Sequence, residues 1–142
     1  MKHKLKTMRV YDLVKAIKMY SDDVLYNTQK NLAIPYTNGY RILVDRLWPR
    51  GINKEKLEPF YWAKEAAPSN ELRKWFGHDQ DRFDEFRRRY IDELNNSVYA
   101  QNFKMLVLDK LKEDDVLLLF AARDKEMNQA VILKDWIIKI IS

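Results

Sequence analysis

Four apolar segments along the chain predict strands. The last of them, residues 116–122, is apolar at every position, whereas a half-exposed strand would alternate apolar and polar residues. Such a run is typical of a strand that is buried on both faces, as the strands of parallel sheets usually are. The predicted strands are residues 5–11, 40–47, 60–63 and 116–122.

Between these segments, apolar residues recur at helical spacing. The clearest case is residues 80–95, where side chains such as Phe86, Tyr90 and Leu94 fall on one face and charged side chains on the other. Residues 21–39 contain several turn-forming residues and are expected to form an irregular connection. The predicted helices are residues 13–20, 70–76, 80–95, 99–111 and 127–140.

Capping signals mark the ends of some of these helices. Asp12 is placed to cap the first helix, and Ser69 is placed to cap the helix that begins at Asn70. Gly77 is expected to end that second helix, because a glycine readily adopts the left-handed conformation of a helix C-terminus.

The order of the elements predicts the fold class. Strands that alternate with helices form parallel sheets whose connections cover both faces. We therefore expect an α/β fold: a single domain over residues 1–142, with a small, mostly parallel sheet of about four strands and helices on both faces. Residues 1–6 are expected to be a flexible basic N-terminus.

Composition narrows the possible chemistry. The 142 residues include no cysteine, which excludes disulfides, thiolate nucleophiles and thiolate metal sites and fits a reducing cytoplasm. No apolar run approaches the ~20 residues that span a bilayer, so we expect no membrane partner. The net charge of +5 resides in residues 1–20, and the rest of the chain is balanced. This basic start permits nucleic-acid binding but is more often a solvated end.

Two of the predicted strands end in charged residues. Asp45, Arg46 and Arg50 follow the second strand, and Arg123 and Asp124 follow the fourth. The carboxyl ends of parallel strands meet at one edge of the sheet, where open α/β sheets bind their ligands. Guanidinium groups bind carboxylates and phosphates in a bidentate manner, and a carboxylate can act as an acid or base. Asp45 could equally form a structural ion pair with Arg46 or Arg50.

Other residues are weaker candidates for this site. Asn128 follows Asp124 near the start of the last helix, where Asp124 could cap the helix and Asn128 could be solvated or bonded to the backbone. Trp48 could stack on a ligand, although packing is the commoner role for such an aromatic residue. Ser69 could help to hold an anion at the helix start. His78 could act as an acid or base.

The sequence lacks the common cofactor motifs. No glycine-rich phosphate loop and no metalloprotease motif occurs, so no nucleotide cofactor is expected. The sequence has only two histidines, His3 and His78, which are too few for a histidine-based metal site, and we expect no metal.

Four stretches of the chain, in order, carry a family resemblance: residues 40–51, 67–79, 86–94 and 117–133. On these stretches the chain resembles the YeaO-like branch of domain-of-unknown-function family 488. The resemblance covers residues 40–137 and implies a small α/β fold without an established activity. Residues 13–39 form a longer connection than is usual in that family, and residues 123–128 lack the Cys-His-Arg motif of its more distant members, so thiol chemistry cannot be transferred.

Three functions remain open on the sequence alone. The first is an enzyme or binder of a small anionic ligand, such as a phosphate or nucleotide fragment, at the carboxyl edge of the sheet. The second is a nucleic-acid-binding protein that uses the basic N-terminus and Trp48. The third is a protein-interaction module without catalysis. The sequence does not decide whether the protein is an enzyme or what its oligomeric state is.

Overall fold

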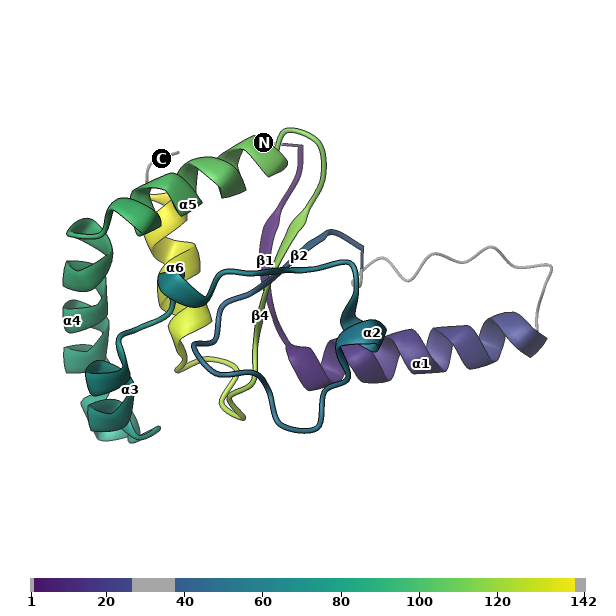
Figure 1. Cartoon of the computed structure of the whole chain (residues 1–142), viewed down its shortest axis with the longest axis horizontal. Helices are drawn as coiled ribbons and strands as arrows, with labels where there is room; N and C mark the ends of the chain where they lie inside the picture. Colours follow the sequence, from purple (N-terminus) through teal and green to yellow (C-terminus); the bar gives the residue numbers. More distant parts are fainter. Residues whose placement is uncertain (1, 27–37, 140–142) are drawn as a thin grey trace.

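A computed structural model describes residues 2–26 and 38–139 of the chain, and the side chains of residues 2–19 and 38–139 (Figure 1). The strands are β1 (Leu5–Arg9), β2 (Tyr40–Leu43), β3 (Tyr61–Trp62) and β4 (Val116–Phe120). The α-helices are α1 (Val10–Tyr26), α2 (Lys54–Leu57), α3 (Asn70–Phe76), α4 (Phe83–Asn95), α5 (Val98–Lys110) and α6 (Gln129–Ile138). Two short 3₁₀ helices are η2 (Lys64–Ala66) and η3 (Gln80–Arg82).

The four strands form one parallel sheet in the order β1-β4-β2-β3. β4 therefore lies in the interior of the sheet, where Leu118 pairs with Thr7 of β1 on one side and with Ile42 of β2 on the other. All five residues of β4 are buried, as the unbroken apolar run predicts. The α/β fold class expected from the order of the elements is confirmed.

Helices pack on both faces of the sheet, and β4 contributes alternate side chains to the two cores. Leu118 and its neighbours at positions 116 and 120 belong to the larger core, which α3, α4, α5 and α6 complete. Leu117 and Leu119 face the opposite side and pack with Leu13 of α1 and Leu57 of α2. Figure 1 shows α1 and α2 on one side of the sheet and α4, α5 and α6 on the other.

The first helix differs from the expectation. It begins at Val10, directly after β1, so Asp12 lies in its first turn and does not cap it. Burial explains the earlier start, because Val10 and Leu13 lie three positions apart and are both fully buried against the sheet. The helix also continues to Tyr26, so the prediction of an irregular segment is wrong for residues 21–26. The rest of that predicted connection, residues 27–37, lies outside the described residues.

The two caps that the sequence predicts for α3, Ser69 and Gly77, are confirmed. The Ser69 hydroxyl accepts a hydrogen bond from the backbone N–H of Leu72, at 3.2 Å, and so satisfies one of the free donors at the start of α3. Gly77 ends the helix with φ = 53°, in the left-handed region that favours glycine. These caps fix the position of the segment that leads from the carboxyl edge of the sheet into α4.

Candidate functional site

Asp45 lies at the carboxyl edge of the sheet and links several elements there. Its Oδ2 accepts a hydrogen bond from the backbone N–H of Ala121, directly after β4, at 2.9 Å. Its Oδ1 accepts from the side-chain amide of Gln129, the first residue of α6. Its backbone carbonyl accepts from the indole N–H of Trp62 in β3, at 2.7 Å. Asp45 therefore joins the ends of β2, β3 and β4 to the start of α6.

Burial changes the acidity of Asp45. Loss of solvent raises the pKa of its carboxyl group from 3.8 to about 7, although the hydrogen bonds from Ala121 and Gln129 act in the opposite direction. A carboxyl with this pKa is present in both protonation states near neutral pH. It can hold or release a proton there, which an exposed aspartate would not do.

Arg46 points away from this carboxylate and toward the segment before α3. Its Nε donates to the carbonyl of Pro68 at 2.9 Å, and its Nη2 donates to the carbonyl of Ala67 at 3.0 Å. Its third contact is with Glu65, at 3.7 Å. Among the described residues Asp45 has no ion pair with Arg46 or Arg50, so the structural ion pair considered for the sequence does not form. Arg46 instead fixes the loop that enters α3.

Asp124 organises the loop after β4. Its Oδ1 accepts from the backbone N–H groups of Met127 and Glu126, both at 2.9 Å, and its Oδ2 accepts from the side chain of Gln80 at 3.0 Å. The two backbone N–H groups, Met127 before Glu126, lower the pKa of Asp124 below its ordinary value, and Gln80 adds to the effect. Asp124 is therefore ionised at neutral pH, whereas Asp45 is only partly ionised there.

Asn128 is the N-cap of α6, whereas the sequence suggested Asp124 for this role. Its Oδ1 accepts from the backbone N–H of Val131 at 3.1 Å, and its Nδ2 donates to the backbone carbonyl of Asp124 at 2.8 Å. Only 1% of the residue is exposed. Both hydrogen-bonding ends of this amide are thus used within the protein, so Asn128 supports the loop and the helix start.

Arg50 and Arg123 are exposed cations at this edge. They lie on the loops that follow the neighbouring strands β2 and β4. Neither guanidinium group has a hydrogen bond or ion pair with another residue in the described part of the chain. The backbone of Arg50 is fixed, since its carbonyl accepts from the hydroxyl of Tyr11 at 2.7 Å. Both side chains are available to a ligand from solution.

Trp48 is a packed aromatic residue. Its ring centroid lies 5.5 Å from that of Phe60 and 5.4 Å from that of Trp62. Its indole N–H donates to the carbonyl of Ile52 at 2.8 Å. These contacts, on the face of the sheet that α1 and α2 cover, stabilise the loop between β2 and α2.

Ser69 and His78 lie on either side of α3. Besides capping the helix, the Ser69 hydroxyl donates to Glu93 of α4 at 2.6 Å, and the Ser69 backbone N–H donates to the same carboxylate at 2.9 Å. His78 is exposed and has φ = 59°, and its ring lies 6.1 Å from that of Phe76. No hydrogen bond joins Ser69 or His78 to Asp45 in the described residues.

Several residues that hold this edge together are not predicted as site residues by the sequence. They are Gln80, Gln129, Glu93 and Tyr90, whose buried hydroxyl donates to the carbonyl of Ala66 at 2.6 Å. One feature of the sequence could indicate Gln129 as a site residue: it lies beside Asn128, at the start of a helix that follows a strand. The sequence spacing does not predict the contacts of the other three residues, because their hydrogen-bond partners are distant in sequence.

The basic N-terminus is partly neutralised where the structure describes it. Lys6 forms an ion pair with Asp115 at 3.0 Å, and His3 lies 3.7 Å from the same carboxylate. The backbone N–H of Lys4 also donates to Asp115, at 2.8 Å. These residues lie beside the start of β4, at the end of the sheet opposite to Asp45.

Two further properties hold for the described residues. No group of three or more His, Cys, Asp or Glu side chains is arranged to hold a metal ion within residues 2–19 and 38–139. None of the helices in the described ranges is long and apolar enough to cross a membrane.

Comparison with known proteins identifies the family. The chain is 44% identical to the uncharacterized protein YeaO of Escherichia coli over 101 residues, which cover 71% of this chain and 85% of that protein. It is 46% identical to the uncharacterized protein Rv3073c of Mycobacterium tuberculosis over 69 residues, which cover 49% of this chain and 58% of that protein. No solved structure matches the chain. Residues 26–142 match the family model described as the inactive DUF488-N3 subclade, and the chain therefore belongs to this YeaO-like branch of the DUF488 family.

Proposed function

We propose that the protein binds a small anionic ligand at the carboxyl edge of its sheet and does not catalyse a reaction there. The observation that supports this proposal best is the pair of exposed, unpaired guanidinium groups of Arg50 and Arg123 on the loops after two neighbouring strands. This edge is where open α/β sheets bind their ligands. In the proposal, Arg50 and Arg123 contact the anion, and Asp45 and Asp124 hold the two loops.

The suggested ligand is a phosphate group, free or part of a nucleotide fragment. A guanidinium group presents parallel N–H donors that match two oxygens of a phosphate or carboxylate. Arg50 and Arg123 remain charged at any physiological pH, so the pH dependence of binding would follow the second ionisation of the phosphate. A cytoplasmic location is part of the proposal, and the cysteine-free sequence favours it.

The contacts of the other candidate residues favour binding over catalysis. The hydroxyl of Ser69 accepts from the backbone N–H of Leu72 and donates to Glu93, so both of its contacts serve to fix the start of α3 against α4. Both carboxylate oxygens of Asp45 already accept hydrogen bonds from the protein. The matching subclade is itself described as inactive. These features support a binding role for the Arg50 and Arg123 pair.

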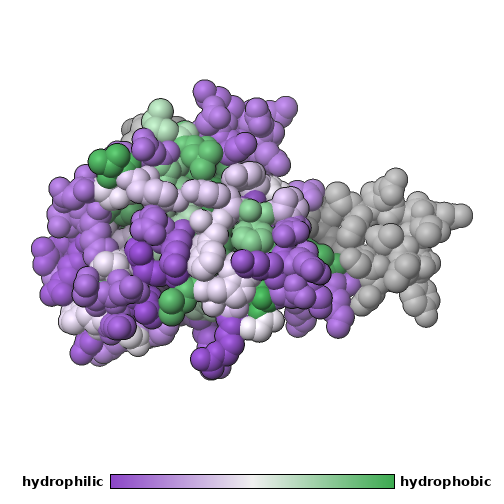
Figure 2. All heavy atoms as spheres, viewed as in Figure 1, coloured by the Kyte–Doolittle hydropathy of each residue, from purple (hydrophilic) through white to green (hydrophobic). Residues whose placement is uncertain are grey.

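The alternative functions have less support. Trp48 is engaged with neighbouring rings, which leaves little of its face for a nucleic-acid base. A protein-interaction module would be favoured by a continuous apolar patch. On the face seen in Figure 2, hydrophilic residues predominate and the hydrophobic ones form small, separate patches.

A thermal-shift screen of phosphorylated metabolites tests the proposal. A ligand present at about one hundred times its Kd would stabilise the folded state by about 2.7 kcal/mol, which is readily measured as a rise in Tm. We expect the wild-type protein to respond and the double variant Arg50→Gln/Arg123→Gln to lose the response. Arg88→Gln is the matched control, because Arg88 is an exposed arginine on α4 that pairs with Glu85. A screen without stabilising ligands, or equal shifts in wild type and double variant, would refute the proposal.

A further inference from the structure

Arg73, in the middle of α3, stands out among the arginines of the chain. The sequence has ten arginines, and seven of their guanidinium groups form a hydrogen bond or ion pair within the described part of the chain. The three that form neither are Arg50, Arg73 and Arg123. Two of these three already belong to the anion site proposed above, so the third is a candidate for the same site.

The guanidinium group of Arg73 is buried at its base and open at its end. Among the described residues, its Nε is the one buried side-chain nitrogen or oxygen without a hydrogen-bond partner. Its terminal nitrogens, Nη1 and Nη2, have no partner either, and they are not buried. Buried donors are nearly always paired in folded proteins, so an unpaired one indicates a missing partner such as a bound ion. Packing thus holds the base of this group while its two terminal nitrogens face solvent.

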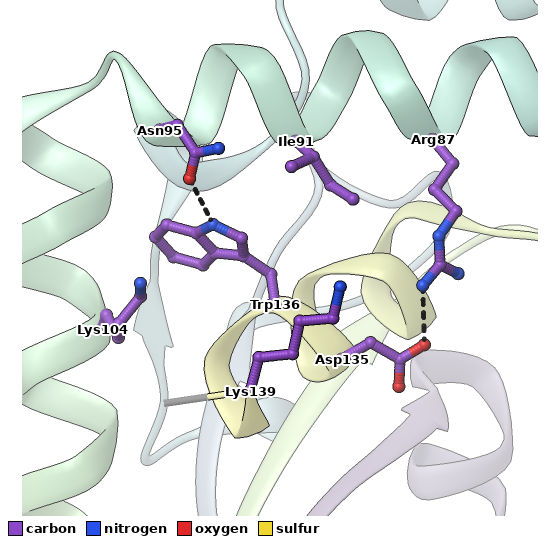
Figure 3. Close-up of a pocket in the computed structure, with 7 residues that line it drawn as sticks. All are labelled: Arg87, Ile91, Asn95, Lys104, Asp135, Trp136 and Lys139. Carbon is purple, nitrogen blue, oxygen red and sulfur yellow. Dashed lines mark hydrogen bonds and ion pairs between the residues drawn. The ribbon is translucent and has the colours of Figure 1, made fainter. Parts of the chain in front are cut away.

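The cavity between α4, α5 and α6 lacks an unpaired donor of this kind. It has a volume of about 260 Å³, and Figure 3 shows the side chains that line it. The indole N–H of Trp136 donates to Asn95 at 2.9 Å, and the centroid of the same ring lies 3.5 Å from the ammonium group of Lys104. Arg87 lies 3.5 Å from Asp135. These groups contact one another, so the unpaired Nε directs attention to α3 and not to this cavity.

α3 is attached on both sides to the loops that carry the other two unpaired arginines. Before the helix, Arg46 of the loop after β2 donates to two backbone carbonyls. After it, Gln80 of η3 donates to Asp124 of the loop after β4, at 3.0 Å. The helix has seven residues, a length of about 10 Å, and Arg73 is the fourth of them. Arg73 therefore lies between the two points where this segment joins the carboxyl edge of the sheet.

The flank of α3 that bears Arg73 is not the one that packs on α4. Leu72 and Phe76 are buried in the core, and the Trp75 ring centroid lies 4.3 Å from the guanidinium carbon of Arg89 in α4. With about 100° between successive residues, Arg73 and Trp75 fall on opposite flanks of the buried face. Long helical side chains also lean toward the N-terminus of their helix, which here is the end joined to the loop after β2. Both features favour a position of the Arg73 guanidinium toward the carboxyl edge.

We propose that Arg73 is a third contact for the anion and that the ligand carries two linked phosphate groups, as a diphosphate does. This inference rests on the proposed function, because Arg50 and Arg123 hold the first phosphate group. A phosphate monoester has close to two negative charges, which these two arginines offset. A third guanidinium group offsets a further charge and binds two more oxygens through its Nη1 and Nη2 donors. The second phosphate group of a diphosphate supplies both.

Isothermal titration calorimetry of the full chain with inorganic phosphate, pyrophosphate and ADP, at constant ionic strength, tests this proposal. We expect wild type to bind a diphosphate at least about tenfold more tightly than phosphate, the gain from one further charge-assisted contact. Preference for both diphosphates would indicate recognition of the diphosphate group alone, and preference for ADP alone would identify an esterified diphosphate. Arg73→Met keeps most of the apolar stem and removes the guanidinium group, so it should lose the preference and still bind phosphate. Lys74→Met, at the next and exposed position of α3, is the matched control and should keep the preference.

The stability of the unliganded variant separates this role from a structural one. The Arg73 guanidinium has no partner in the described part of the protein, so Arg73→Met should leave the Tm of the unliganded protein unchanged or raise it. If Arg73→Met does not fold, Arg73→Lys decides: it keeps the charge but lacks the fork, and it must weaken diphosphate binding more than phosphate binding. Wild type that binds none of the three compounds would overturn the proposed function together with this inference. Phosphate binding without a preference for either diphosphate, or a preference that the Arg73 variants retain, would overturn this inference alone.

Discussion

Replacing Asp45 by Asn tests the central electrostatic feature of the carboxyl edge. The folded protein holds this carboxyl with a pKa of about 7, because burial opposes its ionisation. The substitution removes the ionisation and keeps the shape. The new amide can still accept from Ala121 through its oxygen, and Gln129 can turn its own amide to offer an acceptor. We therefore expect Asp45→Asn to fold and to change mainly the pH dependence of stability.

The size and sign of the effect follow from the two pKa values. In the unfolded chain Asp45 titrates near 3.8, so between that pH and about 7 the folded state holds a proton that the unfolded state has released. This proton makes its full contribution to the unfolding free energy of the wild-type protein below about pH 4. The contribution is lost as the pH rises through about 7. The shift of about three pKa units corresponds to at most about 4 kcal/mol of unfolding free energy, or a Tm difference of roughly 10 °C.

Urea denaturation of both proteins from about pH 4 to about pH 8 measures this contribution. The free energy of unfolding of Asp45→Asn, minus that of wild type, should rise steadily over this range and level off above about pH 7. Taking the difference removes the titration of all groups that the two proteins share. Parallel pH profiles would show that Asp45 does not titrate near neutrality and would refute the reasoning.

Asp124→Asn is the matched control for this experiment. Backbone N–H groups lower the pKa of Asp124, so its contribution to stability is present above its unfolded-state pKa and is lost only as the pH falls through its lower folded-state value. The difference between Asp124→Asn and wild type should therefore stay constant from about pH 5 to about pH 8. A slope in this range like that of Asp45→Asn would mean that the pH effect is not specific to the buried carboxyl.

Three further substitutions test the packing that positions the site. Arg46→Ala removes donors from the carbonyls of Ala67 and Pro68 and should lower the unfolding free energy by about 2–3 kcal/mol in urea titrations; a change near zero would contradict its structural role. Tyr90→Phe leaves a buried carbonyl without its donor, and a loss of about 1–3 kcal/mol is expected by the same assay, whereas an unchanged midpoint would show that the hydroxyl is dispensable. Leu118→Ala opens a cavity in the central strand and should cost about 2–5 kcal/mol, and a Tm equal to that of wild type would argue against the buried position of β4.

Much of the fold is readable from local sequence signals. The unbroken apolar run of β4 predicts a strand buried on both faces, and the structure places it between β1 and β2. Ser69 and Gly77 mark the ends of α3 because caps depend on residues within one turn of each other. The start of α1 was missed because the burial of Val10 against the sheet, a tertiary contact, extends the helix beyond its local capping signal.

The candidate site could be located from the sequence, but its partners could not. The apolar runs and the charged residues after them determine that Asp45, Arg50, Arg123 and Asp124 reach one edge of a parallel sheet. Which of these groups meet depends on the paths of the loops, which spacing does not encode. Only the tertiary structure pairs Asp45 with Gln129, 84 positions away, and leaves both arginines exposed.

Lys104 is the clearest example of a residue whose environment is decided by the tertiary structure and not by the local sequence. In the sequence it is one lysine between Phe103 and Met105 on a helix with apolar residues around much of its circumference, so the pattern does not reveal which way it points. The packing of α5 against α4 and α6 places Lys104 inside and Met105 outside. The sequence alone thus determined the elements, the sheet and the edge that bears the charged residues, because those follow from local spacing. The rotation and packing of the helices decided which charges are buried, since burial depends on contacts between residues far apart in the chain.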